Sequence, residues 1–226
     1  MLEATGLTKS YGGKSVLSGA SFHIDEGELV SIMGPSGEGK STIARILCGT
    51  VKADSGDVTM MGRSVFSKGK FLPEFRRLIQ LIPQQPFASL DPRQTVGDAI
   101  AEPLLYYRLV PDKKAARQQA RQLLERVLLS PSLYGRRPGE LSGGQAQRVL
   151  IARSLTVSPR LLIADEATSM LDVSSQAQIV KILRGIVKDS GISILFISHD
   201  TSLVQAISNR IYCLENGKTL LKGSSQ

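Results

Sequence analysis

The stretch Gly34-Pro35-Ser36-Gly37-Glu38-Gly39-Lys40-Ser41 fits the pattern G-x-x-x-x-G-K-[ST], which is typical of a loop that binds nucleotide phosphates. Its glycines allow backbone N–H groups to turn inward around phosphate oxygens, and a helix that begins on the loop adds its positive end. In this pattern Lys40 reaches the β- and γ-phosphates, and Ser41 places its hydroxyl on Mg²⁺. Thr42 follows directly and is included in the predicted site.

The residues on either side of this loop have the strand and helix patterns that a phosphate loop requires. Leu29 to Met33 predicts a short apolar strand, and Ser41 to Cys48 predicts a helix that begins on the loop. This context argues against a glycine-rich surface turn, which is the other interpretation of the pattern. Further upstream, Val16 to Ile24 is β-prone and Glu26-Gly27 predicts a turn, so antiparallel strands are expected at the start of the chain.

Beyond the loop, strand patterns alternate with helix patterns. From about Phe66 to Ser158 the chain is richer in charged and helix-forming residues, and apolar residues between 115 and 128 fall on one helical face. Buried strands are predicted at Leu161 to Ala164 and at Ile192 to Ser198, with a one-faced helix from 179 to 187 between them. We therefore predict an α/β fold with a mostly parallel sheet, an N-terminal antiparallel β-subdomain and a helical insertion at about 85–157.

Acidic and imidazole side chains follow the two later strands. Asp165 ends an apolar strand beside the predicted phosphate loop, where it can hold Mg²⁺ through water. Glu166 comes next and is the candidate to orient and deprotonate the attacking water. An Asp-Glu pair is weak by itself, since many such pairs lie at helix N-termini. His199 follows the strand from Ile192 to Ser198, which places it at the same edge, whereas His23 has no such setting and is interpreted as structural.

The stretch Leu141-Ser142-Gly143-Gly144-Gln145 precedes a predicted helix that continues to Arg153. A hydroxyl and two flexible backbone N–H groups at a helix N-terminus bind an anion. By itself the stretch would be interpreted as a capped helix start with a glycine turn. Because the chain already has a phosphate loop, a second anion site suggests that two copies share one nucleotide.

Composition and charge exclude several classes of protein. The 226 residues are 42% apolar and 21% charged, with a formal net charge of +8. The basic residues are spread along the chain, which favours a solvated surface over a nucleic-acid interface. Cys48 and Cys213 lack metal or disulfide spacing and indicate a reducing compartment. No signal-peptide pattern is visible, and no apolar run approaches the roughly 20 residues that span a bilayer. We therefore expect a soluble protein that reaches a membrane only through a partner.

With these motifs in order, the sequence closely resembles the ATP-binding cassette (ABC) family over nearly the whole chain. The family motifs match as follows: Tyr11 the aromatic A-loop, Gly34 to Ser41 Walker A, Gln84 in Ile82-Pro83-Gln84-Gln85-Pro86 the Q-loop, Leu141 to Gln145 the signature, Leu161 to Glu166 Walker B, Ser169-Met170-Leu171-Asp172 the D-loop, and His199 the switch histidine. Gln85 beside Gln84 leaves the Q-loop glutamine open by one residue.

The resemblance implies a single ABC ATPase domain over 1–226, with the RecA-like core and β-subdomain at about 1–84 and 158–226 and the helical subdomain at about 85–157. It implies ATP and Mg²⁺ as ligands and a head-to-tail dimer. ATP on Walker A of one copy, with adenine on Tyr11, would be closed over by Ser142, Gly144 and Gln145 of the other. Glu166 would be the general base and His199 would contact the γ-phosphate. Gln84 would link Mg²⁺ and the γ-phosphate to the helical subdomain.

Finer features resemble the dipeptide, oligopeptide and nickel importers, namely Ser89 to Arg93 after the Q-loop and Asp172 to Gln178 after Walker B. This implies permease subunits and a second ABC ATPase subunit, identical or related, as partners, with a solute-binding protein acting indirectly and no nucleic acid. The expected location is peripheral, at the cytoplasmic face of the inner membrane. The resemblance to importers also implies that the segment from Phe87 to Val96 contacts the permease.

Two residues depart from the importer pattern, and two other classes of function are considered. Ala167 stands where peptide importers usually have proline, and Met170 replaces a small D-loop residue. Ala167 is similar to the metallophore branch, so peptide, nickel and metal chelate all remain as solutes. The alternative function is a soluble ABC ATPase acting on nucleic acid or the ribosome, although the chain has no second cassette or inserted arms. A GTPase switch is disfavoured because no N-K-x-D motif is present.

Overall fold

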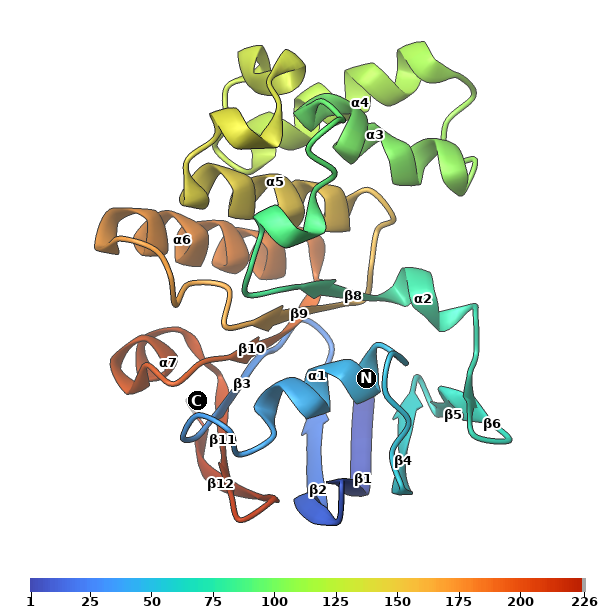
Figure 1. Cartoon of the computed structure of the whole chain (residues 1–226), viewed down its shortest axis with the longest axis vertical. Coiled ribbons are helices and arrows are strands. Elements are labelled where there is room, and N and C mark those ends of the chain that lie inside the picture. Colours follow the sequence, from blue (N-terminus) through green and yellow to red (C-terminus); the bar gives the residue numbers. More distant parts are fainter. Residues whose placement is uncertain (225–226) are drawn as a thin grey trace. The chain divides into compact units, whose positions relative to one another are not determined.

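The computed structural model describes residues 1–224, and the chain divides into two units, which are taken in turn (Figure 1). The first unit contains Met1–Leu81, Arg160–Glu166 and the residues from Ile186 onward. The second contains Ile82–Pro159 and Ala167–Gly185. The D-loop, which follows Glu166, thus lies in the second unit.

A six-stranded sheet in the order β12-β11-β3-β10-β9-β8 forms the centre of the first unit. Its parallel neighbours are β11 (Arg210–Glu215), β3 (Leu29–Met33), β10 (Ser193–Ile197) and β9 (Leu161–Asp165), which lie side by side although they come from the blue and the orange-to-red parts of the chain (Figure 1). At one edge β12 (Lys218–Ser224) pairs antiparallel with β11, and β8 (Ile79–Ile82) lies at the other. All five residues of β10 are buried, as expected for a parallel strand covered on both faces.

The start of the chain forms an antiparallel sheet in the order β2-β1-β4-β5, as the sequence predicts. Its strands are β1 (Leu2–Tyr11), β2 (Lys14–Ile24), β4 (Ser55–Met60) and β5 (Arg63–Ser64). The short strands β6 (Phe66–Ser67) and β7 (Lys70–Phe71) pair with each other, and a single helical turn, α2 (Phe75–Leu78), precedes β8.

Helix α1 (Lys40–Leu47) lies in the core that the two larger sheets share. Its Ile43, Ile46 and Leu47 are fully buried. They belong to one apolar cluster with side chains from β1, β2, β3, β9 and β10. This packing fixes the start of α1 at the C-terminal edge of the parallel strands. The short helix α7 (Thr201–Ile207) contacts β3.

The second unit is built mainly of helices. Helices α3 (Val96–Tyr106), α4 (Lys113–Arg126) and α5 (Gly143–Leu155) contact one another in pairs. The 3₁₀ turns are η1 (Phe87–Ser89), η2 (Pro131–Gly135) and η3 (Pro138–Glu140), and the long helix α6 (Val173–Ser190) begins in this unit. Glycine is required at position 97 of α3, because a Cβ there would lie 2.2 Å from the ring of Tyr134.

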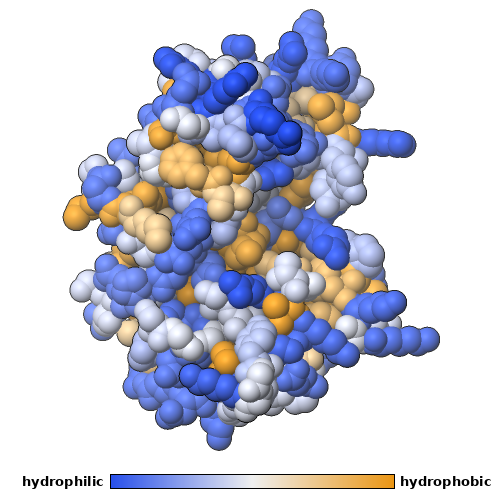
Figure 2. All heavy atoms as spheres, in the orientation of Figure 1, coloured by the Kyte–Doolittle hydropathy of each residue, from blue (hydrophilic) through white to orange (hydrophobic). Residues whose placement is uncertain are grey.

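These elements confirm the predicted fold class: a mostly parallel sheet, an antiparallel N-terminal sheet and a helical insertion. Within residues 1–224, no helix combines the length and apolar character needed to cross a membrane. On the face shown in Figure 2, apolar residues occur in separate groups among hydrophilic ones.

Candidate nucleotide-binding and hydrolysis site

The phosphate loop connects β3 to α1, and close contacts require glycine at two of its positions. A Cβ on Gly34 would lie 2.6 Å from the carbonyl oxygen of Leu214 in β11. Gly39 has a φ of 99°, and a Cβ there would lie 2.6 Å from Cγ1 of Val16. Between them Pro35, Ser36 and Gly37 are exposed, and Glu38 is half-buried. The loop thus lies against β11 and β2 and presents its middle to solvent.

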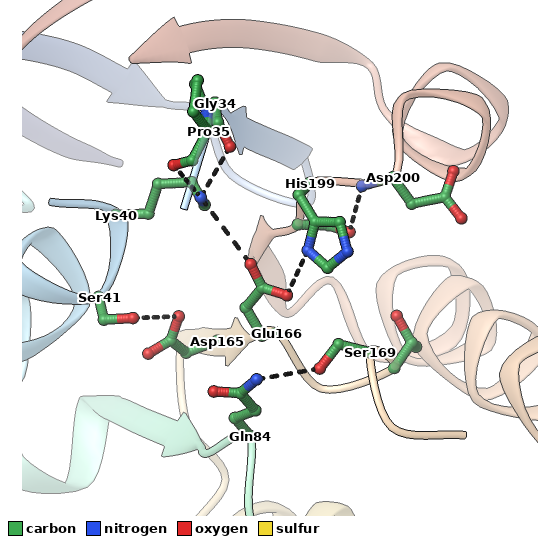
Figure 3. A network of polar contacts seen from close by, with 12 residues as sticks. Gly34, Pro35, Lys40, Ser41, Gln84, Asp165, Glu166, Ser169, His199 and Asp200 are labelled. Carbon is green, nitrogen blue, oxygen red and sulfur yellow. Dashed lines mark hydrogen bonds and ion pairs between the residues drawn. The ribbon is translucent and has the colours of Figure 1, made fainter. Parts of the chain in front are cut away.

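Lys40 is the first residue of α1 and is 5% exposed. Its Nζ donates to the carbonyl oxygens of Gly34 at 2.7 Å and Pro35 at 2.8 Å, and it lies 3.9 Å from Oε1 of Glu166 (Figure 3). The loop therefore fixes the ammonium group within its own turn, at the place where a phosphate chain would lie along the loop. Thr42, in the first turn of the helix, is buried.

Ser41 and Asp165 place two oxygen donors together, since Oγ of Ser41 donates to Oδ1 of Asp165 at 3.1 Å. Burial raises the pKa of Asp165 above its usual range, and the Glu166 carboxylate raises it further, whereas the Ser41 hydrogen bond lowers it. A hydroxyl and a carboxylate suit Mg²⁺, which is usually bound through one or two carboxylates together with substrate phosphates and waters. Within residues 1–224 there is no cluster of three acidic, histidine or cysteine side chains that would hold a metal by itself.

Glu166 follows β9 with a φ of 51°, a left-handed conformation that costs a non-glycine residue about 1–2 kcal/mol. Its backbone N–H donates to the carbonyl oxygen of Ile197 in β10 at 2.9 Å. Its Oε2 lies 2.7 Å from Nδ1 of His199, and the Glu166 side chain is 12% exposed (Figure 3). Strained backbone of this kind is often found at functional sites. The turn directs the carboxylate back across the edge of the sheet, between Lys40 and His199.

The first unit therefore brings together five of the predicted residues: Lys40, Ser41, Asp165, Glu166 and His199. All five lie at or just beyond the C-terminal ends of parallel strands or at the start of α1, the edge where such sheets bind ligands. The arrangement offers a cation for phosphate, a metal-binding pair and a carboxylate positioned by a histidine. Such a set can place a water molecule against a phosphoryl group.

Gln84 lies in the second unit, where its Nε2 donates to Oγ of Ser169 at 3.2 Å (Figure 3). The preceding residue is also fixed, since Nε2 of Gln147 in α5 donates to the carbonyl oxygen of Pro83 at 3.1 Å. The Q-loop candidate is thus connected to the D-loop and to the signature helix. These contacts favour Gln84 over Gln85 as the structurally engaged glutamine.

The predicted signature forms the start of α5. Ser142 is the N-cap residue, with its Oγ accepting from the N–H of Gln145 at 3.2 Å, and Oε1 of Gln145 accepts from the N–H of Ser142 at 3.0 Å. This capping box fixes both polar side chains at the helix N-terminus. Gly144 has no room for a side chain, since a Cβ there would lie 2.7 Å from Oγ of Ser175 in α6. A Cβ on Gly143 would contact Leu171 at 3.4 Å.

Asp172 caps the other helix of this pair. Its carboxylate accepts from the hydroxyls of Ser174 at 2.6 Å and Ser175 at 2.7 Å, and from the N–H of Ser175 at 3.0 Å. These hydrogen bonds, led by that of Ser174, hold the pKa of Asp172 well below its usual range. The start of α5 and the start of α6, which follows the D-loop, are packed against each other through Gly144 and Ser175.

Tyr11, the predicted adenine platform, is the last residue of β1 and is 44% exposed. Contacts around it involve two residues that the motifs do not include, Lys9 and Asp54. They lie far apart in sequence, and no local pattern connects them. His23, interpreted as structural, contacts the hydroxyl of Tyr212 at 3.1 Å through its Nδ1.

Comparison with known proteins agrees with this geometry. Residues 17–169 match the ABC transporter family. Over 200 residues the chain is 48% identical to Glutathione import ATP-binding protein GsiA of Escherichia coli (strain K12), and over 206 residues it is 48% identical to that of Shigella flexneri. These matches cover 88% and 90% of the chain but only 32% and 33% of the relatives, so the chain spans a third of their length.

Solved structures give the same result. The dimeric post-hydrolysis state of the ATP-binding cassette MJ0796, bound to ADP and Pi, has a TM-score of 0.88 at 30% identity and covers 100% of this chain and 99% of that chain. The cbiO1 protein of Clostridium perfringens, part of the ABC transporter complex cbiONQ, has a TM-score of 0.88 at 27% identity, with 99% and 88% covered. The match over most of the chain, together with the motifs placed at the sheet edge, shows that this protein belongs to the ABC transporter family.

Proposed function

We propose that this chain is the ATP-hydrolysing subunit of an ABC importer. The observation that supports ATP hydrolysis is the position of Glu166, whose carboxylate lies between Lys40 and His199 at the edge of the parallel sheet. A binding module without chemistry would have no need of a carboxylate on a strained backbone beside the phosphate loop. The residues instead match what phosphoryl transfer to water requires: a positioned base and charge stabilisation.

In the proposed reaction the backbone N–H groups of the loop and the ammonium of Lys40 bind the β- and γ-phosphates of ATP. Glu166 orients a water molecule and accepts its proton as the water oxygen attacks the γ-phosphorus. The bond from the γ-phosphorus to the bridging oxygen breaks, and ADP leaves with that electron pair. His199 keeps the Glu166 carboxylate in place through the 2.7 Å contact. Ser41 and Asp165 would bind Mg²⁺, which neutralises phosphate charge when it is present.

The site requires a second cassette in this proposal. The signature residues Ser142, Gly144 and Gln145 lie at a helix N-terminus, which suits a phosphate group of a nucleotide bound to another copy. In the same unit two large apolar side chains are exposed, Met170 of the D-loop at 65% and Val173, the first residue of α6, at 82%. Apolar side chains with this much exposure next to a binding motif are expected at a protein interface. The solved dimer of a related cassette supports the same assembly.

The importer assignment rests on the likeness to glutathione import proteins and on the importer-like stretches after Gln84 and Asp172. We propose peptide-type solutes as the cargo, permease subunits as direct partners and a solute-binding protein as an indirect one. The proposed location is the cytoplasmic face of the membrane that holds the permease. Nickel and metal chelates remain as alternative cargoes on the sequence pattern around Ala167.

The experiment has two parts. Purified wild-type protein is assayed for phosphate release from Mg-ATP beside Lys40→Met and a control, Lys188→Met, which changes an exposed lysine of α6. Activity in the wild type and the control but not in Lys40→Met is expected. The chain is then reconstituted with the permease subunits that co-purify with it, and ATP-dependent uptake of labelled glutathione or a dipeptide is measured. Nucleic-acid-stimulated ATPase activity without any uptake would refute the importer assignment.

A further inference from the structure

The last residues of β1 are fixed by one carboxylate that lies outside every recognised motif. Asp54 contacts three successive residues of the strand: its N–H donates to the carbonyl oxygen of Thr8 at 2.9 Å, its Oδ1 accepts from Nζ of Lys9 at 2.7 Å, and its Oδ2 accepts from the N–H of Ser10 at 2.7 Å. The next residue along the strand is Tyr11. Asp54 therefore defines the backbone and side-chain positions that immediately precede the aromatic ring.

The ammonium that Asp54 binds also lies on the aromatic ring. Nζ of Lys9 is 5.5 Å from the centroid of the Tyr11 ring, within the range of a cation–π contact. The Lys9 side chain is only 16% exposed, whereas Tyr11 is 44% exposed. One face of the ring thus meets a fixed cation, and the ring retains a large exposed surface. The hydrogen bonds from Lys9 and Ser10 lower the pKa of Asp54, so the carboxylate that orients Lys9 is ionised at neutral pH.

The strand end that carries Tyr11 is linked to the phosphate loop through β2. Tyr11 pairs with Lys14 across the β1–β2 turn, and two residues further along β2 is Val16. Val16 packs directly against the loop, since its Cγ1 is 2.6 Å from the position of a Cβ on Gly39. Two residues of strand span about 7 Å, so only a short stretch of β2 separates Lys14, the residue opposite Tyr11, from the contact with the loop.

We propose that Lys9 and Asp54 are positioning residues that hold the Tyr11 ring ready to stack on the adenine base, an inference that rests on the proposed ATP site. A ring that is already oriented loses less rotational freedom when a base stacks on it. The cation on one face also restrains the ring against the strand end. Asp54 acts through Lys9, and neither residue needs to touch the nucleotide.

The competing explanation is purely structural: the Asp54 contacts join the ends of β1 and β4 and stabilise the sheet. The two explanations differ in which part of the nucleotide they affect. A disordered sheet would disturb the phosphate loop through Val16 and weaken all ligands. A disordered ring would weaken only ligands that have a base.

Calorimetric titration with Mg-ATP and with Mg-tripolyphosphate separates them. Lys9→Met and Asp54→Asn should each weaken ATP binding about two- to fivefold, the range for a cation–π contact, with tripolyphosphate binding unchanged. Lys9→Arg should restore ATP binding, because a guanidinium can pair with Asp54 and cover the ring. Tyr11→Ala gives the limit for complete loss of the platform, and Lys188→Met is the surface control.

Three results would overturn either the role of Lys9 and Asp54 or the proposed function. Equal weakening of both ligands by Lys9→Met would show a structural role and overturn the inference. Unchanged ATP binding in Lys9→Met, with weaker binding in Tyr11→Ala, would overturn the inference while leaving the ATP site intact. If Lys40→Met also leaves ATP binding unchanged, the proposed function itself fails.

Discussion

Oε2 of Glu166 lies 2.7 Å from Nδ1 of His199, and the two residues follow neighbouring parallel strands. Asp165, at the end of β9, is in register with Ile197, at the end of β10. The sheet therefore sets the separation of the two side chains, and the left-handed turn at Glu166 directs one toward the other. A carboxylate paired in this way is held in one orientation beside the phosphate loop.

The first prediction concerns this contact. His199→Ala should lower ATP turnover by about 10²-fold, at the lower end of what a positioned proton-transfer system contributes, because Glu166 loses its orienting partner. ATP binding should change little, since Lys40 and the loop remain. Turnover and ATP affinity are measured together. His23→Ala is the matched control, because it changes the other histidine of the chain, and a comparable loss of turnover in it would contradict the role of His199.

The second prediction concerns the stability cost of Asp165. Its pKa is raised by burial, so the folded protein binds a proton at this site more readily than the unfolded chain does. Because the proton binds more tightly in the folded state, the ionised carboxylate disfavours folding at neutral pH, and this penalty disappears as the pH falls through the raised pKa toward the ordinary value. Asp165→Asn should therefore raise the Tm at pH 7 while it abolishes hydrolysis.

The measurement is the Tm of Asp165→Asn and wild type between pH 7 and pH 4. The difference should shrink as the pH falls. Mg-ATP should stabilise the wild type more than the variant, because the metal-binding carboxylate is absent from the variant. A variant that is less stable than wild type at pH 7 would show that the ionised Asp165 carboxylate does not disfavour folding.

The central elements follow from the sequence because the buried strands β3 and β9 are mostly apolar and the phosphate loop has a distinctive pattern. Leu29 to Met33 is predicted and observed as β3, and the predicted strand at Leu161 to Ala164 is extended by one residue. The helix expected at Ser41 to Cys48 spans Lys40–Leu47. The hydrophobic periodicity of each of these elements, and the residues that begin and end it, are local features of the sequence, so the elements can be predicted from it.

The long-range contacts could not be predicted in this way. The left-handed backbone of Glu166 has no sequence signal, because glycine or asparagine would be the expected residue for that conformation. The packing of Ser175 on Gly144 joins the starts of α5 and α6, which are separate in sequence, and both residues lie in the second unit. The pairing of Lys9 with Asp54 likewise depends on how β1 meets β4.

The third prediction tests the contact between Gly144 at the start of α5 and Ser175 at the start of α6. Gly144→Ala should destabilise the protein by about 1–3 kcal/mol, the usual cost of overpacking, because the new methyl group would lie 2.7 Å from Oγ of Ser175. Adding Ser175→Gly should recover part of this loss. Urea denaturation measures both. Gly139→Ala is the control, since no atom lies within 4 Å of its Cβ position, and equal destabilisation in the control would refute the contact.

The fourth prediction concerns assembly. Met170→Asp should weaken ATP-dependent dimerisation, because it places a charge on a side chain that the second cassette is expected to bury. Light scattering after size-exclusion chromatography, with and without Mg-ATP, measures the dimer. Leu128→Asp, at another exposed apolar residue of the same unit, should have no such effect. Dimerisation of Met170→Asp at wild-type strength would place the interface elsewhere.

A single-turnover assay of Glu166→Gln with radiolabelled Mg-ATP tests whether Glu166 is the base that accepts the proton of the attacking water. Glutamine retains the shape of the side chain but cannot accept the proton of the attacking water. We expect the variant to bind ATP and retain it as ATP, while the wild type and the surface variant Glu125→Gln convert it to ADP and phosphate. Conversion of bound ATP by Glu166→Gln at the wild-type rate would show that Glu166 is not the base.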